Sequence, residues 1–233
     1  MHPFDSIVET YDAWYDTFGG QAVFNAELRC LRSLCTDCRG RWLEAGVGTG
    51  RFASGMGIAY GIDPSLPMLR MAAGRGVFAC AARAENLPFR NHLFDGVLLA
   101  VSLCFIPNPG RALEECRRIL RPGGSLLLGI ISGEGPWGLA YKRKKAEGHP
   151  VYSMARFSDI SEITALAEKA GFTLKKAASS LFWKPGEAPE ENPRITDGIS
   201  ADGGFIGLLY SMTAPESYKI MPSGDQQHQR HIS

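Results

Sequence analysis

Residues 43–52 read Leu-Glu-Ala-Gly-Val-Gly-Thr-Gly-Arg-Phe, and residues 61–65 read Gly-Ile-Asp-Pro-Ser. The first stretch places Gly46, Gly48 and Gly50 directly after a short run that is typical of a buried strand. Because glycine has no Cβ atom, the backbone N–H groups of such a turn can approach a ligand closely. The pattern therefore predicts a strand, a ligand-binding glycine loop and then a helix.

Two acidic residues indicate which ligand the loop takes. Glu44 falls at the end of the strand, where a carboxylate would repel a pyrophosphate but attract the ammonium and sulfonium groups of S-adenosylmethionine. Asp63 falls at the end of the next predicted strand, where an acidic side chain can accept hydrogen bonds from both ribose hydroxyls. The two stretches together predict a pocket for an adenosine-containing cofactor.

The glycine pattern also permits a nicotinamide cofactor. Residues 48–53, Gly-Thr-Gly-Arg-Phe-Ala, satisfy the looser dinucleotide pattern with alanine in third place. Read from Gly46, however, the strict pattern requires glycine at the position of Arg51. No Gly-Lys-Ser/Thr ending follows, which excludes the phosphate loop of nucleotide triphosphatases. A nicotinamide-dependent oxidoreductase thus stays open as an alternative.

The composition is that of an ordinary globular protein. At 233 residues the chain can bury one substantial core. A formal net charge of +1 provides no global attraction for nucleic acid or for an anionic membrane. Residues 1–13 carry no apolar signal segment, and the apolar stretch 96–106 is too short to span a bilayer. We therefore expect a cytoplasmic protein with no nucleic-acid partner and no membrane insertion.

The cysteines could form a metal site, but the helical pattern favours packing. Cys30, Cys35 and Cys38 have a spacing seen in some iron–sulfur proteins. Leu28, Leu31 and Cys35 fall on one stripe at helical spacing, which predicts that Cys35 packs beside leucines in the core. We expect reduced thiols and no metal.

Between residues 41 and 170, short apolar runs alternate with helical patterns, which predicts a mostly parallel sheet covered by helices. One helix begins at Pro109 and stops before Arg121-Pro-Gly-Gly; another begins with Asp159 and Glu162 at capping-box spacing and ends at Gly171. Strands are expected near residues 41–44, 58–62, 77–81, 96–101 and 125–131, each apolar enough to be covered on both faces.

Two further strands are expected at the end, at residues 172–180 and 204–212. No helix fits the Pro- and Glu-rich segment 185–202 between them, so these strands should pair antiparallel. The predicted fold is α/β, with a Rossmann-like, mostly parallel sheet, helices on both faces, and a terminal antiparallel β-hairpin.

Several short motifs occur in a family-specific order. They are the glycine loop at 44–50, Gly-Ile-Asp-Pro-Ser with Met68, Ala-Glu-Asn-Leu-Pro-Phe at 84–89, Phe-Asp at 94–95, Leu-Arg-Pro-Gly-Gly at 120–124 and Ala-Gly-Phe at 170–172. In this order the chain resembles the class I S-adenosylmethionine-dependent methyltransferases, and within them the type-11 family related to quinone-biosynthesis and other small-molecule methyltransferases. The resemblance implies one methyltransferase domain over residues 1–221, with an N-terminal helical lid at 1–38 and a substrate-side insertion at 132–158. The tail at 222–233 is polar, with Gln and His, and is expected to be disordered.

The resemblance also implies roles for individual residues. The glycine loop would line the methionine end of S-adenosylmethionine, Glu44 would lie near its ammonium group, and Asp63 would hold the ribose. Residues 64–68 would flank the adenine, with residues 84–85 at its edge. The implied cofactor-binding set is Glu44, Gly46, Gly48, Gly50, Asp63, Pro64, Ser65, Met68, Ala84, Glu85, Ala100, Val101 and Tyr11.

One position departs from the family. The residue before Ala84 is often an aspartate that accepts a hydrogen bond from the adenine amino group, but here it is Arg83. A guanidinium cannot accept that bond. Either backbone carbonyls read the adenine edge, or Glu85 takes over.

The methyl acceptor is less well defined by the sequence. Aromatic and basic residues in the lid and after the fifth strand are candidates for substrate contact, with ordinary packing as the alternative: Trp14, Tyr15, Trp137, Tyr141, Tyr152 and Arg156. The Asn/Asp-Pro-Pro-aromatic motif of many nucleobase and glutamine methyltransferases is missing from residues 100–104. No catalytic dyad is evident, as fits a methyl transfer that depends mainly on alignment. We expect in-line transfer to a small-molecule acceptor, with a non-catalytic S-adenosylmethionine-binding protein as a further alternative.

Overall fold

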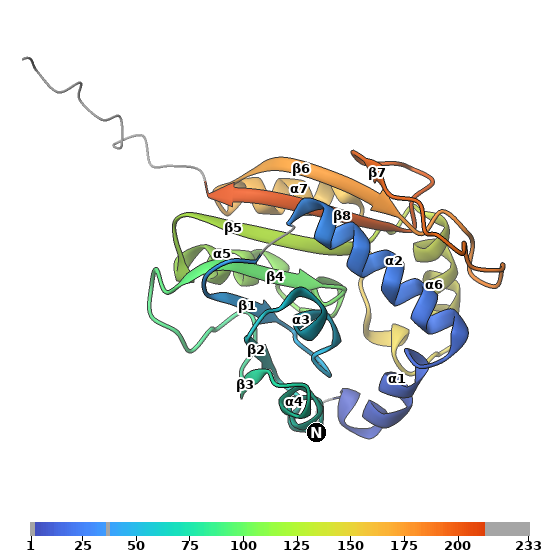
Figure 1. The fold of residues 1–233 in the computed structure, drawn as a ribbon, viewed down its shortest axis with the longest axis horizontal. Helices are drawn as coiled ribbons and strands as arrows, with labels where there is room; N and C mark the ends of the chain where they lie inside the picture. The colour runs from blue at the N-terminus through green and yellow to red at the C-terminus, as the bar shows by residue number, and fades with distance from the viewer. Residues whose placement is uncertain (1–2, 36–37, 213–233) are drawn as a thin grey trace, which may run out of the picture.

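The computed structural model describes residues 3–35 and 38–212, and these build one eight-stranded sheet in the order β3-β2-β1-β4-β5-β8-β6-β7 (Figure 1). The strands are β1 (Trp42–Ala45), β2 (Tyr60–Asp63), β3 (Phe78–Ala81), β4 (Phe94–Ala100), β5 (Leu120–Ile131), β6 (Phe172–Ser180), β7 (Thr196–Asp197) and β8 (Phe205–Met212). The predicted disordered tail at 222–233 lies outside the described residues.

The first five strands are parallel, as predicted. β1 pairs with β2 on one side and β4 on the other, and β5 pairs with β4. Their central residues are fully buried, Leu98 and Leu127 among them, because helices cover both faces. β3 differs from the prediction, since it is an edge strand and Phe78 is largely exposed.

The sheet ends in antiparallel strands, which confirms the predicted hairpin. β8 lies between β5 and β6 and pairs antiparallel with both. The connection at 181–204 contains no helix, and its short strand β7 adds to the outer edge of β6. The fold is therefore the α/β, Rossmann-like arrangement expected from the sequence.

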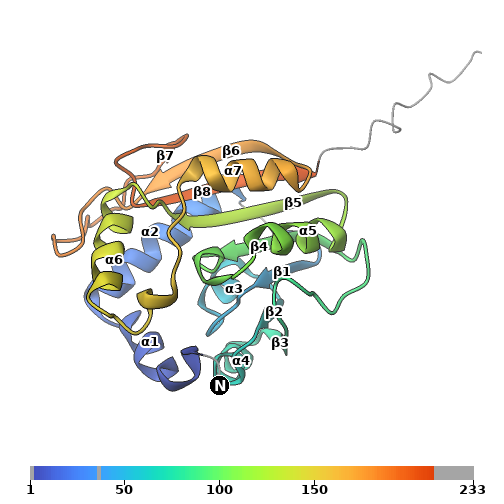
Figure 2. The same cartoon turned by 180° about the vertical axis from the view of Figure 1, so that it is seen from behind.

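Helices cover the two faces of the sheet (Figures 1 and 2). One face of the sheet is covered by α2 (Phe18–Leu34), α3 (Arg51–Met56) and α4 (Leu66–Gly74), which share one apolar core. The opposite side holds α5 (Pro109–Ile119) and α7 (Ile160–Lys169) over a second core. The remaining elements are η1 (Pro3–Ser6), α1 (Val8–Trp14), η2 (Leu103–Phe105), α6 (Pro136–Ala146) and η3 (Tyr152–Met154).

The two helices whose ends were predicted from the sequence, α5 and α7, begin in different ways. The Asn108 side chain accepts a hydrogen bond from the Arg111 N–H at 3.0 Å, and Pro109 occupies the first turn of α5. Asp159 is the N-cap of α7, but its side chain makes no capping hydrogen bond, so the predicted capping box is not formed.

Close packing fixes α2 against the sheet. A Cβ atom on Gly207 of β8 would lie 2.7 Å from Leu34 and 3.3 Å from the Cys30 sulfur, so glycine at this position lets the helix approach. The helix ends one residue earlier than the predicted stripe, and Cys35 is its half-buried C-cap, which packs against the apolar core that contains Leu28 and Leu31. Across the described ranges, no group of three or more His, Cys, Asp or Glu side chains could hold a metal ion.

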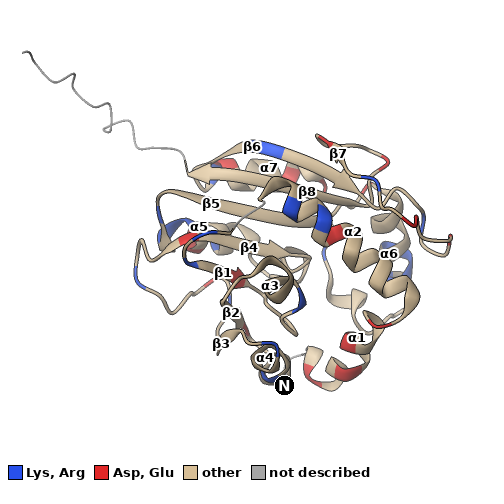
Figure 3. Cartoon of the chain, viewed as in Figure 1, with Lys and Arg blue, Asp and Glu red and all other residues tan. Residues whose placement is uncertain are grey.

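Charged residues are dispersed over the fold. Figure 3 shows Asp and Glu along α1, and Lys and Arg at separate places that include α4 and α6. Among the described helices, none is both long and apolar enough to cross a membrane.

Candidate functional site

A cavity of about 450 Å³ opens at the carboxyl ends of β1, β2 and β4. This is the edge at which parallel α/β sheets bind ligands, because the loops that follow adjacent strands meet there. Residues of the predicted cofactor set on the cavity wall are Tyr11, Gly46, Gly48, Asp63, Pro64, Met68, Ala84, Glu85, Ala100 and Val101. The structure thus gathers most of that set around one cavity.

Two of the loop glycines, Gly48 and Gly50, play different structural parts. Gly48 has a φ of +52° and lines the cavity, and a Cβ atom there would meet nothing within 4 Å. Gly50 has a φ of +85° and is buried, and a Cβ atom there would lie 2.9 Å from the Ala72 backbone of α4. Gly50 therefore packs the loop against α4 and, unlike the expectation, does not line the cavity.

Asp63 organises the loop from the end of β2. Its Oδ2 accepts a hydrogen bond from the Gly48 N–H at 3.0 Å, and its Oδ1 accepts one from the Ser65 N–H at 2.9 Å. A carboxylate can accept about four hydrogen bonds, so two ribose hydroxyls could join these partners. The position at the cavity wall suits that geometry.

Ser65 differs from its expected place beside the adenine. It is fully buried as the N-cap of α4, where its hydroxyl accepts a hydrogen bond from the Met68 N–H. The same hydroxyl donates to the Asp5 carboxylate at 2.7 Å. Ser65 thus joins the N-terminal segment to α4 and does not line the cavity.

Glu44 is buried at the end of β1, only 1% exposed, and is not on the cavity wall. Its Oε2 has no hydrogen-bond partner among the residues that the structure describes. Burial raises the pKa of Glu44 well above the usual value, the Ala53 N–H lowers it, and the charge of Asp63 raises it further. A cation beside this carboxyl would favour its ionised form.

Arg83 lies on the cavity wall with a mostly exposed side chain. Its Nε is 3.8 Å from the Glu85 carboxylate. A weak, exposed pair of this kind leaves both side chains able to rearrange. The structure is therefore compatible with both expected acceptors for the adenine amino group, a backbone carbonyl or the Glu85 carboxylate.

A charged network, absent from the sequence-based set, fixes α1 to the glycine loop. The Asp12 carboxylate is 5% exposed and accepts hydrogen bonds from Arg51 Nε at 2.8 Å and from Arg75 at 2.7 Å. Burial alone would raise the pKa of Asp12, but hydrogen bonds from the two arginines and from Thr49 outweigh it and lower that pKa to about 2. Arg51 directly follows the loop, so the network sets the position of α1 over the cavity.

The residues predicted to contact substrate lie at several places, none of them on the wall of this cavity. Trp14 is 40% exposed, and the buried Trp137 donates its indole N–H to the Trp183 carbonyl. The rings of Tyr141 and Tyr152 stack with centroids 4.2 Å apart, next to buried Tyr15. These three tyrosines belong to a cluster described below.

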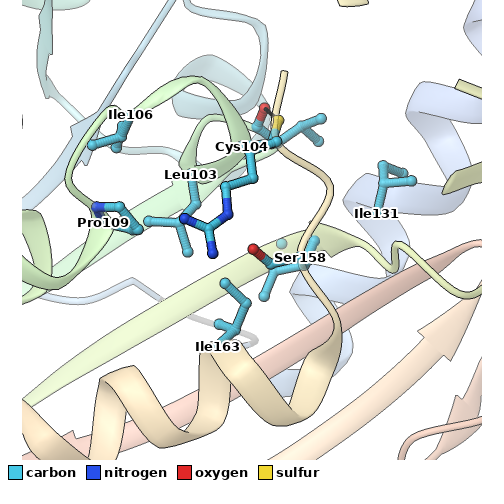
Figure 4. A pocket seen from close by; sticks show the side chains of 11 residues that line it. Leu103, Cys104, Ile106, Pro109, Ile131, Ser158 and Ile163 are labelled. Atoms are coloured by element: carbon cyan, nitrogen blue, oxygen red, sulfur yellow. Dashed lines mark hydrogen bonds between the residues drawn. The ribbon is translucent and has the colours of Figure 1, made fainter. Parts of the chain in front are cut away.

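Arg156 lies on a separate crevice of about 20 Å³, enough for roughly one water molecule. Figure 4 shows this crevice, with Leu103, Cys104 and Ile163 around it. The Arg156 side chain pairs with Glu162, and the backbone N–H of Arg156 donates to the Cys104 carbonyl. These contacts join α7 to the turn after β4.

Other wall residues were missed by sequence reasoning. The turn after β4 contributes Ser102, Phe105, Ile106 and Pro107, and the distant Phe4 and Met154 complete the wall. Only the position of residues 102–107 after a predicted strand could have indicated a role, because loops after parallel strands line ligand sites.

Residues 43–128 match the family model described as a methyltransferase domain. The chain is also similar to the crystal structure of a "SAM-dependent methyltransferase, possible histamine N-methyltransferase" from Thermotoga maritima. The two are 36% identical with a TM-score of 0.84, over 91% of this chain and 99% of that one.

Two further relatives extend the comparison. An uncharacterized protein of Mycobacterium tuberculosis is 38% identical over 85% of this chain and 70% of its own length. A demethylmenaquinone methyltransferase of Renibacterium salmoninarum is 28% identical over 71% of this chain and 73% of its own length.

Proposed function

This chain belongs to the class I S-adenosylmethionine-dependent methyltransferases, and we propose that it transfers the methyl group in line to a small-molecule acceptor. The observation that carries the proposal is the cavity, whose wall combines the glycine loop, Asp63 and the turn after β4. Methyl transfer needs a donor and an acceptor held in one enclosed space, because alignment supplies most of the catalysis.

The residues present fit S-adenosylmethionine. Gly48 leaves open space where a side chain would fill the cavity, and Asp63 offers its carboxylate at the same wall. Glu44 adds a buried carboxyl with an oxygen unpartnered among described residues. The Asp63 carboxylate at the cavity wall favours a cationic ligand and disfavours a pyrophosphate, which supports S-adenosylmethionine over a nicotinamide dinucleotide.

The protein's own part in the reaction is to bind, orient and exclude water. When bound, the cofactor supplies a methyl group on a sulfonium, activated for attack by an acceptor atom in line with the departing sulfur. In this proposal Asp63 holds the ribose, and Gly46 and Gly48 give close backbone contact to the methionine end. Tyr11 and Phe4 cover the cavity from the N-terminal side and keep water from the reacting atoms.

A small-molecule acceptor is supported by the shape of the site and by the relatives. Part of the cavity wall is apolar and includes Phe105, Ile106 and Met154. The names of the Thermotoga and Renibacterium proteins refer to histamine and demethylmenaquinone, which are both small molecules. We therefore place nucleic acid outside the proposed acceptors.

Calorimetric titration of the purified protein with S-adenosylmethionine and, separately, with NADH tests the cofactor. We expect S-adenosylmethionine to bind one site per chain and NADH to give no binding. Binding of NADH alone would make an oxidoreductase the better reading.

Turnover separates an enzyme from a silent binder. The protein is incubated with S-adenosylmethionine and a panel of small-molecule acceptors, and S-adenosylhomocysteine release is measured. The proposal expects release that depends on an acceptor. Binding without release for any acceptor in the panel would favour a non-catalytic S-adenosylmethionine-binding protein.

A further inference from the structure

A second buried carboxyl lies on the apolar face of α2. Glu27 is 3% exposed and falls at helical spacing with the buried Val23, Leu31 and Leu34. No hydrogen bond or ion pair reaches its carboxylate from any residue in the described parts of the chain. Because an unpaired carboxylate in an apolar interior is costly, this position calls for a partner that the folded chain does not provide.

Four tyrosines from three other elements pack near the face of α2 that carries this carboxyl. Tyr11 and Tyr15 come from α1, and their hydroxyl oxygens are 3.1 Å apart. Tyr141 comes from α6 and Tyr152 from η3, with the two rings stacked. We call these four residues and Glu27 the tyrosine cluster.

Packing brings the tyrosines to the face of α2 that carries Glu27. The Tyr15 ring lies edge-on to Phe24, one helical turn before Glu27, with ring centroids 5.8 Å apart. Tyr141 and Tyr152 pack in the same apolar core as Val23 and Leu31 of α2. Burial raises the pKa of each tyrosine, and the charge of Glu27 contributes to the increase in every case. Figures 1 and 2 show the carrying helices α1, α2 and α6 on the same end of the molecule. The cluster is thus one assembly of residues that are far apart in the sequence.

The cluster adjoins the cofactor cavity. Tyr11 lines that cavity, and so does Met154, the last residue of η3 that carries Tyr152. Phe4 of the cavity wall also packs edge-on against Tyr11, with ring centroids 5.8 Å apart. The cavity wall at Tyr11 and Met154 is therefore continuous with the tyrosine cluster.

The chemistry of the cluster selects a cation. Aromatic faces attract ammonium and guanidinium groups, and a desolvated carboxylate adds a full opposite charge. The rings already hold protein cations: the Arg51 guanidinium is 5.2 Å from the Tyr15 ring centroid, and Lys144 Nζ is 5.8 Å from the centroids of Tyr141 and Tyr152. An anionic or a neutral acceptor would bring no positive charge to pair with the Glu27 carboxyl.

We propose that the acceptor is an amine, and that the tyrosine cluster binds an ammonium group of it with Glu27 as the counter-charge. This inference rests on the proposed methyltransferase function and deepens it by naming the acceptor class. Glu27 is a specificity-determining residue in this account.

Ligand pairs that differ only in charge test the proposal. Phenethylamine and butylamine are compared with phenethyl alcohol and butanol, and with the anion phenylpropionate, by calorimetry on protein saturated with S-adenosylhomocysteine. We expect at least one amine to bind about tenfold or more tightly than its alcohol, because a charged hydrogen bond contributes about that much, and the anion not to bind.

Proton release gives a second readout. Burial raises the pKa of Glu27 to about 8, so its carboxyl is mostly protonated at pH 7, and an ammonium group beside it should displace that proton. Titrations in buffers of different ionisation enthalpy should show release of close to one proton per amine bound.

Other titratable groups lie near the cluster, so the proton release has to be assigned to Glu27 and not to one of them. The four tyrosine hydroxyls have raised pKa values, and burial raises the pKa of Cys30 to about 11 and of Cys104 to about 12. The His149 ring also lies beside Tyr152, with centroids 4.7 Å apart. H149N is therefore titrated in parallel, and it should keep the proton release that E27Q abolishes.

Substitutions assign the preference to Glu27. E27Q keeps the shape and removes the charge, so it should lose the preference for the amine and retain its affinity for S-adenosylhomocysteine. E27D keeps the charge and should recover part of the preference. E9Q, on the exposed side of α1, is the matched control for a loss of one negative charge and should behave as wild type.

The outcomes distinguish this inference from the proposed function. If S-adenosylhomocysteine binds but no amine exceeds its alcohol by tenfold, or if the preference persists in E27Q, the amine inference is wrong and the methyltransferase proposal stands. If S-adenosylhomocysteine itself does not bind, the proposed function fails and the inference fails with it. Thermal unfolding of each variant confirms that it is folded under the conditions of the titration.

Discussion

The cofactor cavity and the tyrosine cluster lie side by side but are built in different ways. The cavity depends on backbone groups at the ends of parallel strands, and its carboxylate, Asp63, already accepts two backbone hydrogen bonds. The cluster depends on side chains from α1, α2, α6 and η3, and the folded chain gives its carboxyl, Glu27, no hydrogen bond within the described residues. The fold alone supplies hydrogen bonds to the first carboxyl group, whereas the second is left to find its partner in a ligand.

Removing the Asp63 carboxylate should produce the largest effect on the cavity. In D63A the ribose loses its charged hydrogen bonds, and the Gly48 and Ser65 N–H groups lose their acceptor. Calorimetry should show that the affinity for S-adenosylhomocysteine falls by about tenfold to a hundredfold.

The control for D63A is D202A, which removes an exposed aspartate from the distant connection before β8. It should bind S-adenosylhomocysteine as wild type does. Unchanged affinity in D63A would show that the ribose assignment is wrong.

The next effect concerns the ion pairs that join the two regions. D12N leaves Arg51 and Arg75 without their shared carboxylate, and it should lower the free energy of unfolding by about 2 kcal/mol, or the melting temperature by roughly 4–8 °C. Urea unfolding at neutral pH measures the loss.

Acid should erase the difference between wild type and D12N. The pKa of Asp12 is lowered from 3.8 to about 2, so its contribution is complete above about pH 4 and disappears as the pH falls through about 2. The gap in unfolding free energy should therefore be smaller at pH 3 than at pH 7. An equal gap at both pH values would mean that the carboxylate charge of Asp12 does not stabilise the fold.

The smallest effect on cofactor affinity is expected from removing the Arg83 side chain. This substitution tests whether Arg83 takes part in binding the adenine. Its exposed guanidinium cannot accept a hydrogen bond from adenine, and its pairing with Glu85 is weak. R83A should change the affinity for S-adenosylhomocysteine by less than about threefold. A loss comparable to that of D63A would assign Arg83 a direct role that this account does not give it.

The same contrast explains what could be predicted from sequence. The glycine loop, Asp63 and the central strands were predictable because each depends on local pattern: apolar runs, glycine spacing and an acidic residue at a strand end. The packing role of Gly50 and the capping role of Ser65 were not, because they depend on how α4 docks against the loop. Likewise, the exposure of β3 follows from its place at the sheet edge, which composition does not determine.

The tyrosine cluster was only partly accessible to sequence reasoning. Tyr15, Tyr141 and Tyr152 were candidates as aromatic residues in the expected segments, but nothing local linked them to Glu27. The one available signal was an acidic residue on the apolar stripe of the helix at residues 18–34. Asp12 and its arginines were missed for the same reason, since 39 and 63 positions separate the partners.

A crystal structure of the protein with S-adenosylhomocysteine tests the central claim most directly. The account predicts the nucleoside in the cavity, with both ribose hydroxyls on the Asp63 carboxylate, the methionine end at Gly46 and Gly48, and the sulfur facing Tyr11. Ribose hydroxyls directed away from Asp63, or a nucleoside bound outside this cavity, would contradict it.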